Sequence, residues 1–285
     1  MNRENYWLDQ DDAQTRLTNL QIQESINQAE HELCLNWIKY GYVILEQHFS
    51  EQILDTAWAE YDQKLAIDEI TAPEEKNNSE DILPGRTLNP HLKVKGFRDI
   101  MHCQNLLKII NLILNANVIP FQSIASHKGS QQKLHSDVIH MTTDPLGGLV
   151  AAWVAFEDIE EDSGPLEFCP SSHRLPYILS NNLDIDPKDF KENGYTMYHQ
   201  KYEPAIESVI CEHNIKKRIF LAKKGDVLIW HHNLIHGGSL IKDFSLSRKA
   251  LVSHYFDPSC RCYHDLSGEQ ADLSNARSLF SSLKK

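Results

Sequence analysis

The second half of the chain is a series of short apolar segments, and this pattern restricts the possible folds more than any other feature. Turns rich in Gly, Pro and Asp separate the segments, for example Asp144-Pro145-Leu146-Gly147-Gly148. Many short strands joined by such turns are typical of a β-sandwich or a barrel. We predict a β core over residues 118–257, with strands at Val118–Ser126, Gly148–Phe156, Leu166–Cys169, Ile219–Ala222, Val227–Trp230 and Ala250–Phe256.

The N-terminal third has the periodicity of helices instead. Apolar side chains recur on one face of Ser25–Lys39, and Gly41 is placed to end that helix. A strand is expected at Tyr42–Leu45. Ser50 is a good N-cap for a second amphipathic helix, and a further helix is expected from Arg98 through Leu112.

No linker divides the sequence, so we predict one domain, mainly β with flanking helices (α+β). Its predicted parts are a polar arm or peripheral helix (1–24), a largely helical supporting layer (25–115), a surface loop (68–92), the β core, a polar, partly helical insertion over the active site (171–217) and a C-terminal tail (258–285). The whole domain spans 1–285.

Charge and composition exclude several classes of protein. A net charge of -12 argues against nucleic acid or an anionic membrane as the main partner, because both favour basic surfaces. No apolar run reaches the length of a membrane span, and the first residues lack the layout of a secretion signal. The six cysteines are scattered and lack zinc spacing. We therefore expect a cytoplasmic protein with free thiols.

Three side chains far apart in the sequence suggest a metal site. His135 and Asp137 are alternate residues, so on an extended strand both leave the same face. With His236 they make a two-histidine, one-carboxylate set, which covers one face of iron(II) and leaves the other open. The triplet alone is weak evidence in a chain with fifteen histidines. Gly237-Gly238 behind the distant histidine and Arg248 beyond it strengthen the interpretation.

Together with further motifs, this arrangement resembles the phytanoyl-CoA dioxygenase family. The matching motifs are His135-Ser136-Asp137, Trp153, Gly164-Pro165-Leu166, Pro170-Ser171-Ser172-His173-Arg174, Gly225-Asp226, His236-Gly237-Gly238-Ser239 and Arg248. The resemblance covers about residues 30–257. It implies a double-stranded β-helix (jelly-roll, cupin-like) core and a non-haem iron(II) dioxygenase that uses 2-oxoglutarate and O2 as cosubstrates.

The resemblance also implies roles for individual residues. The iron ligands would be His135, Asp137 and His236. The cosubstrate would be bound by Arg248, with Ser239, Trp153 and Gln132 nearby. This chain has His-Gly-Gly-Ser where the family usually has His-Gly-Ser, so either Gly238 or Ser239 could take the serine's place. His231 and His232 lie close to His236 in the sequence and are alternative candidates for the third ligand. No glycines follow them directly, so His236 is preferred.

The substrate is less defined. Residues that could reach it are His173, Arg174, Arg86 and His140, and a structural role is the alternative for each of them. We expect hydroxylation of a small free metabolite, in specialised-metabolite (natural-product) biosynthesis, because Lys216-Lys217-Arg218 is too short a basic run for a coenzyme A platform. Halogenating relatives lack an acidic ligand, so Asp137 disfavours halogenation. Alternatives are an acyl-CoA hydroxylase, a non-catalytic jelly-roll binding protein and a zinc hydrolase.

Overall fold

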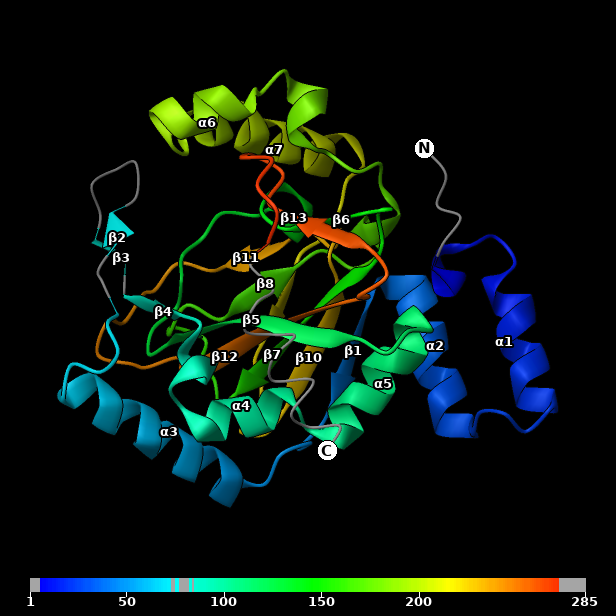
Figure 1. Cartoon of the computed structure of the whole chain (residues 1–285), viewed down its shortest axis with the longest axis horizontal. Helices are drawn as coiled ribbons and strands as arrows, with labels where there is room; N and C mark the ends of the chain where they lie inside the picture. Colours follow the sequence, from blue (N-terminus) through cyan, green and yellow to red (C-terminus); the bar gives the residue numbers. More distant parts are fainter. Residues whose placement is uncertain (1–5, 73–74, 77–81, 84, 272–285) are drawn as a thin grey trace.

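The structure, a computed structural model, describes residues 6–72, 75–76, 82–83 and 85–271. It combines helices with antiparallel sheets in a mixed α+β arrangement (Figure 1). None of the helices in these ranges is both long enough and apolar enough to cross a membrane.

The largest sheet has six antiparallel strands in the order β1-β10-β7-β12-β5-β4. These are β1 (Tyr42–Leu45), β4 (Arg86–Leu88), β5 (Ile119–Ser126), β7 (Leu149–Ala155), β10 (Val227–His231) and β12 (Ala250–Phe256). A smaller sheet, in the order β11-β8-β9, contains β8 (Leu166–Phe168), β9 (Arg218–Phe220) and β11 (His236–Gly238). Two-stranded pairs join β2 (Glu75–Lys76) to β3 (Ile82–Leu83) and β6 (Thr142–Asp144) to β13 (Arg261–Tyr263). Each predicted strand of the β core is confirmed, with ends that differ by a few residues.

Both faces of the large sheet are buried, which explains why β7 is apolar throughout rather than alternating. Ala152 and Val154 pack into the core formed with the N-terminal helices. Ala151 and Trp153 face the other way, toward Phe168 of the small sheet. Each large apolar side chain buried in this way contributes about 1.5–3 kcal/mol.

The helices of the N-terminal third are η1 (Trp7–Asp9), α1 (Ala13–Ile22), α2 (Gln28–Tyr40), α3 (Glu51–Ala66), η2 (Pro90–Leu92), α4 (Lys95–Met101) and α5 (Gln104–Leu114). Asn27 and Glu30 form a capping box at the start of α2, and Gly41 ends it with a left-handed φ of 77°. Figure 1 shows α3, α4 and α5 along one side of the sheets.

Two predictions for this region are wrong. The single helix expected from Arg98 is divided into α4 and α5, because Cys103 adopts a ψ of 119°, outside the helical range. The loop expected at 68–92 contains strand β4 at the edge of the large sheet. An edge strand pairs on one side only, so a short polar segment can form it; Thr87 is anchored there by Tyr61, with 2.6 Å between the hydroxyl oxygens. The Asn77-Asn78 pair of that loop, like Pro73 and Pro84, lies outside the described residues.

The segment 171–217 lies on the opposite side of the sheets from α3–α5 (Figure 1). It contains η4 (Ser172–Arg174), η5 (Ser180–Leu183), α6 (Pro187–Asn193), the π-helical turn η6 (Tyr198–Tyr202) and α7 (Glu203–Glu212). Tyr202, which is fully buried, belongs to an apolar cluster that this segment shares with Ile139 and Ile235. The segment is therefore packed directly against the two loops that carry the predicted metal ligands.

Candidate metal centre and cosubstrate pocket

The two histidines are brought together by their own backbones. His135 N–H donates to the carbonyl of His236 at 2.9 Å, and His236 N–H donates back to the carbonyl of His135 at 2.8 Å. Contrary to prediction, His135 and Asp137 do not lie on a regular strand: His135 forms an isolated bridge and Asp137 begins the short helix η3 (Asp137–Ile139). Ser136 between them is extended, with φ −110° and ψ 151°, so both side chains still leave the same side.

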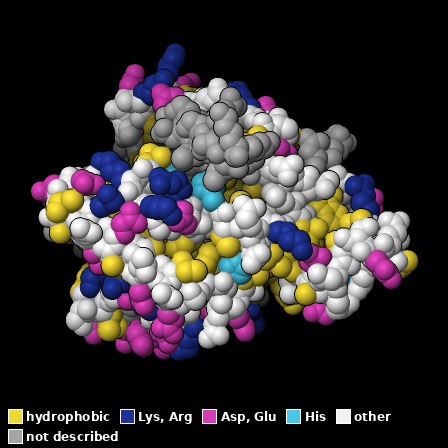
Figure 2. Space-filling model, turned by 60° about the horizontal axis from the view of Figure 1, so that its bottom comes forward, with side chains coloured by type: hydrophobic (Ala, Val, Ile, Leu, Met, Phe, Trp, Pro, Cys, Tyr) yellow, Lys and Arg dark blue, Asp and Glu magenta, His cyan; other side chains and the backbone are white. Residues whose placement is uncertain are grey.

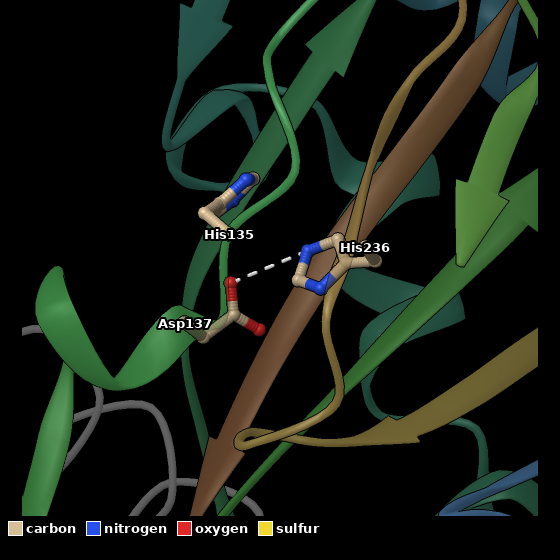
Figure 3. Close-up of side chains that lie close together, drawn as sticks. All are labelled: His135, Asp137 and His236. Carbon is tan, nitrogen blue, oxygen red and sulfur yellow. Dashed lines mark ion pairs between the residues drawn. The ribbon is translucent and has the colours of Figure 1, made fainter. Parts of the chain in front are cut away.

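The three side chains converge on one point (Figure 3). His135, Asp137 and His236 each offer one ligand atom, and these atoms lie within 4.8 Å of one another. His236 Nε2 lies 3.5 Å from Asp137 Oδ1. All three residues are buried, with 4–7% of their surface exposed. This geometry suits a single metal ion.

Hydrogen bonds determine which imidazole nitrogen can face a metal. His135 Nδ1 lies 2.8 Å from the carbonyl oxygen of Lys133, and His236 Nδ1 lies 2.9 Å from that of Leu234. A carbonyl oxygen only accepts, so each Nδ1 carries the proton and each Nε2 presents a lone pair. Such a bond from the outer nitrogen is the usual support of a metal-binding histidine. The residues present therefore fit a divalent cation.

The electrostatics of the triad agree with this fit. Burial, helped by the nearby His236, lowers the pKa of His135 to about 3, so its imidazole is neutral. Burial alone would raise the pKa of Asp137. The neighbouring histidines, with His236 foremost, and a hydrogen bond from Trp230 outweigh burial and lower that pKa to about 2. The site thus combines the neutral imidazole of His135 with the ionised carboxylate of Asp137, the forms in which these groups bind metals.

A cavity of about 430 Å³ opens beside the triad. Inward-facing residues of β5 and β12 line it, including Gln122, Ser126 and His254. Arg248 enters the same cavity; it is 4% exposed, and its Nε finds no hydrogen-bond partner among the described residues. The guanidinium carbon lies 5.8 Å from the centre of the Trp153 ring. A buried cation with no ion pair to any described acid is costly, and it marks a place for an anionic ligand.

The structure places the other predicted residues in two groups. Gln132, Arg86 and His140 line the cavity together with the triad, Arg248 and Trp153. Gln132 links two of them, with its Oε1 3.2 Å from Arg86 Nη1 and its Nε2 3.2 Å from His135 Nε2.

Ser239, His173 and Arg174 do not line this cavity. Ser239 Oγ donates to Glu167 at 3.3 Å. His173 and Arg174 belong to a second hollow beside η1, where Arg174 donates to the carbonyl of Ile38. These contacts favour the structural alternative for His173 and Arg174.

Several cavity residues were not predicted from the sequence: Gln122, Met141, Tyr195, Trp230, His254 and His264. Gln122 and His254 could have been found, because they have the strand parity of Ser126 and Ala250, which face the same way. Tyr195 and His264 come from the insertion and the C-terminal tail, where no periodicity indicates direction.

The fold and the site together define a protein with a mononuclear, two-histidine, one-carboxylate centre on antiparallel sheets. The chain belongs to the phytanoyl-CoA dioxygenase (PhyH) family, which it matches over residues 37–242. It is 27% identical over 175 residues to the peroxisomal phytanoyl-CoA dioxygenase of Bos taurus, covering 57% of this chain and 46% of the relative. The human enzyme gives the same identity over 176 residues, with the same coverage. The chain thus spans about half the length of these curated relatives.

Solved structures share the fold at lower identity. The epimerase SnoN, in complex with Fe3+, alpha ketoglutarate and nogalamycin RO, has a TM-score of 0.63 at 17% identity, covering 82% of this chain and 85% of that chain. EctD from S. alaskensis, with 2-oxoglutarate and 5-hydroxyectoine, has a TM-score of 0.59 at 17% identity, covering 81% and 77%. At such identities the likeness concerns the fold alone.

Proposed function

We propose that this protein is an iron(II)- and 2-oxoglutarate-dependent dioxygenase that hydroxylates a C–H bond of a small metabolite. The observation that carries the proposal is that one cavity holds both the metal triad and a buried guanidinium, that of Arg248, which forms no ion pair with any described acid. His135, Asp137 and His236 suit iron(II), and Arg248 suits the distal carboxylate of 2-oxoglutarate, which a guanidinium can bind with two parallel hydrogen bonds. A zinc hydrolase would have no use for that guanidinium.

When bound, iron(II) and 2-oxoglutarate supply the oxidising chemistry, in which O2 is consumed, succinate and CO2 are released and one oxygen atom enters the substrate. The chain's own residues would bind the iron and 2-oxoglutarate and orient them in the cavity. The protons on Nδ1 of His135 and His236 are held by backbone carbonyls, which keeps both Nε2 atoms available. Arg248 and Trp153 line the cavity together with the triad, and its apolar walls limit water near the reacting C–H bond.

We further propose that the large and small sheets are the two halves of a double-stranded β-helix within one domain. Trp153 and Trp230 of the large sheet belong to the same apolar cluster as Phe168 of the small sheet, which supports this assignment. The segment 171–217 would act as a cover, since Tyr195 from this segment lines the cavity. The six cysteines are all unpaired, which suits the reducing compartment expected from the sequence.

For the serine that normally assists 2-oxoglutarate binding, we propose Ser130 rather than Ser239. Ser239 contacts Glu167 and lies outside the cavity lining. Ser130 lines the cavity, and its Oγ lies 2.5 Å from the point where a β-carbon on Gly238 would stand. The hydroxyl thus occupies the space that a side chain at 238 would need, so a serine on the loop beside strand β11 can supply the same donor.

The size of the cavity supports a small substrate. A volume of about 430 Å³ must hold 2-oxoglutarate as well, which leaves room for a metabolite but not for coenzyme A. Two members of the basic run are engaged elsewhere: Lys217 pairs with Glu167, and Arg218 donates to Tyr42. On the face drawn in Figure 2, Lys and Arg are scattered among Asp and Glu. An acyl-CoA is the second candidate substrate, because the curated relatives are named as phytanoyl-CoA dioxygenases. Only its acyl end would enter the cavity.

The test is anaerobic addition of iron(II) and then 2-oxoglutarate, followed by the visible charge-transfer band of the complex. We expect the band in the natural protein, its loss in Asp137→Ala and weaker 2-oxoglutarate binding in Arg248→Ala. Arg16→Ala, which removes an exposed helix ion pair, is the control. On admission of air, succinate should form. Absence of the band in the natural protein would overturn the proposal. If the complex forms but no candidate substrate leads to succinate, the result would favour a non-catalytic binding protein.

A further inference from the structure

The two oxygens of Asp137 have different surroundings. Oδ1 faces the other members of the triad and lies 3.5 Å from His236 Nε2. Oδ2 points away and accepts a hydrogen bond from the indole Nε1 of Trp230 at 2.8 Å. Asp137 is 7% exposed and Trp230 is 2% exposed, so water competes little for this bond. A bond to an ionised acceptor in such surroundings is among the stronger hydrogen bonds in proteins.

Trp230 is held rigidly in the position from which it makes this bond. It lies within β10, paired on one side with Tyr42 of β1 and on the other with Ala151 of β7. Its ring packs against His236, with 4.6 Å between the ring centres. A donor on a central strand cannot follow the carboxylate if the latter rotates, so the indole fixes the orientation of the carboxylate.

We propose that Trp230 is a positioning residue that withholds Oδ2 of Asp137 from the metal, so that this carboxylate binds through Oδ1 alone. The inference rests on the proposed function. Carboxylates bind metals through one oxygen or through two. A second oxygen from Asp137 would occupy a position on the open face of the iron, which 2-oxoglutarate and a gaseous ligand must share. By engaging Oδ2, the indole keeps that position available.

The variant that tests this is Trp230→Phe, which retains an aromatic ring and removes the N–H. Trp58→Phe is a matched control: Trp58 is also buried, at 5% exposed, but its Nε1 has no hydrogen-bond partner among the described residues. It packs on the helix side of the large sheet, with its ring centre 4.9 Å from that of Phe156. Both variants lose the same atoms, and only one loses the bond to a predicted iron ligand.

The readout is nitric oxide binding to the anaerobic iron(II)–2-oxoglutarate complex, followed by electron paramagnetic resonance. Nitric oxide probes the open position without turnover. We expect its affinity to fall about 10- to 100-fold in Trp230→Phe, the usual effect of removing such a supporting contact, and to stay within about twofold in Trp58→Phe. The absorption of the cobalt(II)-loaded protein should also change in Trp230→Phe, because the number of coordinating atoms changes.

Thermal unfolding without metal separates this role from a purely structural one. A lower Tm for Trp230→Phe with unchanged nitric oxide affinity would overturn the inference. If that variant does not fold, benzothienylalanine at position 230 keeps the indole's shape without the N–H and takes its place in the same assay. Failure of the natural protein to bind iron(II) and 2-oxoglutarate would instead overturn the proposed function, and this inference with it.

Discussion

Arg248 allows a test in which two measurements should move in opposite directions. Arg248→Met keeps an unbranched side chain of similar length and removes the guanidinium. Arg248 is 4% exposed, and its guanidinium makes a long hydrogen bond, 3.5 Å from Nη2 to the carbonyl oxygen of Lys128. Burial beside Arg86 lowers its pKa only to about 10, so the group stays charged at neutral pH. Its charge is therefore a cost to folding and a benefit to binding.

The two effects can be estimated separately. Removing one member of a buried, hydrogen-bonded charge pair costs about 2–5 kcal/mol of binding, which raises the Kd for 2-oxoglutarate by about 30- to 5,000-fold. Replacing a buried charge by an apolar group of similar volume is neutral or stabilising by about 1–4 kcal/mol. We therefore expect Arg248→Met to bind 2-oxoglutarate far more weakly while its ligand-free form unfolds at the same free energy or a higher one.

Anaerobic titration with 2-oxoglutarate in the presence of iron(II) measures the first effect, and urea unfolding without metal measures the second. Arg174→Met is the contrasting control. Arg174 donates to the carbonyl of Ile38 outside the metal cavity, so its loss should leave 2-oxoglutarate binding unchanged and lower stability by about 0.5–1.5 kcal/mol. A Kd within about threefold of the natural protein, or a stability loss above about 2 kcal/mol in Arg248→Met, would show that Arg248 is a structural residue.

Three further predictions concern single contacts. Ser130→Ala should raise the Kd for 2-oxoglutarate about tenfold or more, and Ser239→Ala should not; equal effects in the same titration would contradict the assignment of the hydroxyl. Asp9→Asn should lower the free energy of unfolding by about 1–3 kcal/mol at pH 7, measured in urea. Burial opposes ionisation of Asp9, but His231, 3.3 Å away, lowers its pKa below the usual 3.8, so this stabilisation is complete above that pH and is lost as the pH falls through the lower folded value. Tyr202→Phe should cost about 1–3 kcal/mol of stability, because the hydroxyl accepts from a buried backbone N–H between the first two ligands; no change in Tm would refute this.

Much of the site could be predicted because its chemistry depends on residue types that are rare in cores. Histidines beside a carboxylate and glycines, followed by an arginine, have few structural explanations. Arg248 and Trp153 do line one cavity, with the guanidinium carbon 5.8 Å from the centre of the Trp153 ring. The strands of the β core could be predicted for a similar reason, since apolar runs bounded by Gly and Pro turns have few other uses. Segments without such markers, such as β4 and β13, were missed.

The remaining features depend on tertiary contacts that no local pattern encodes. Trp230 is an ordinary apolar residue of a strand by sequence, and its bond to Asp137 exists only because β10 passes beside the loop that carries the carboxylate. His264 reaches the cavity because β13 pairs with β6 near the start of the C-terminal tail. Ser130 lies on a loop, and it acquires its position because Gly238 of strand β11 leaves space for its hydroxyl.

The buried charges of the site predict that iron and 2-oxoglutarate bind cooperatively. Asp137 and Arg248 carry one negative and one positive charge in the same cavity, and both are nearly inaccessible to water. Iron(II) alone adds two positive charges to this site and 2-oxoglutarate alone adds two negative charges, whereas the two together leave its net charge unchanged. Burying net charge is costly, so each should raise the affinity of the other, by about 5- to 150-fold for a typical coupling of 1–3 kcal/mol. Calorimetric titration of 2-oxoglutarate with and without cobalt(II) measures the coupling in the natural protein. In Arg248→Met the coupling should persist, because the metal still compensates the dicarboxylate, while both affinities for 2-oxoglutarate fall; independent binding in the natural protein would show that the two ligands do not share this cavity.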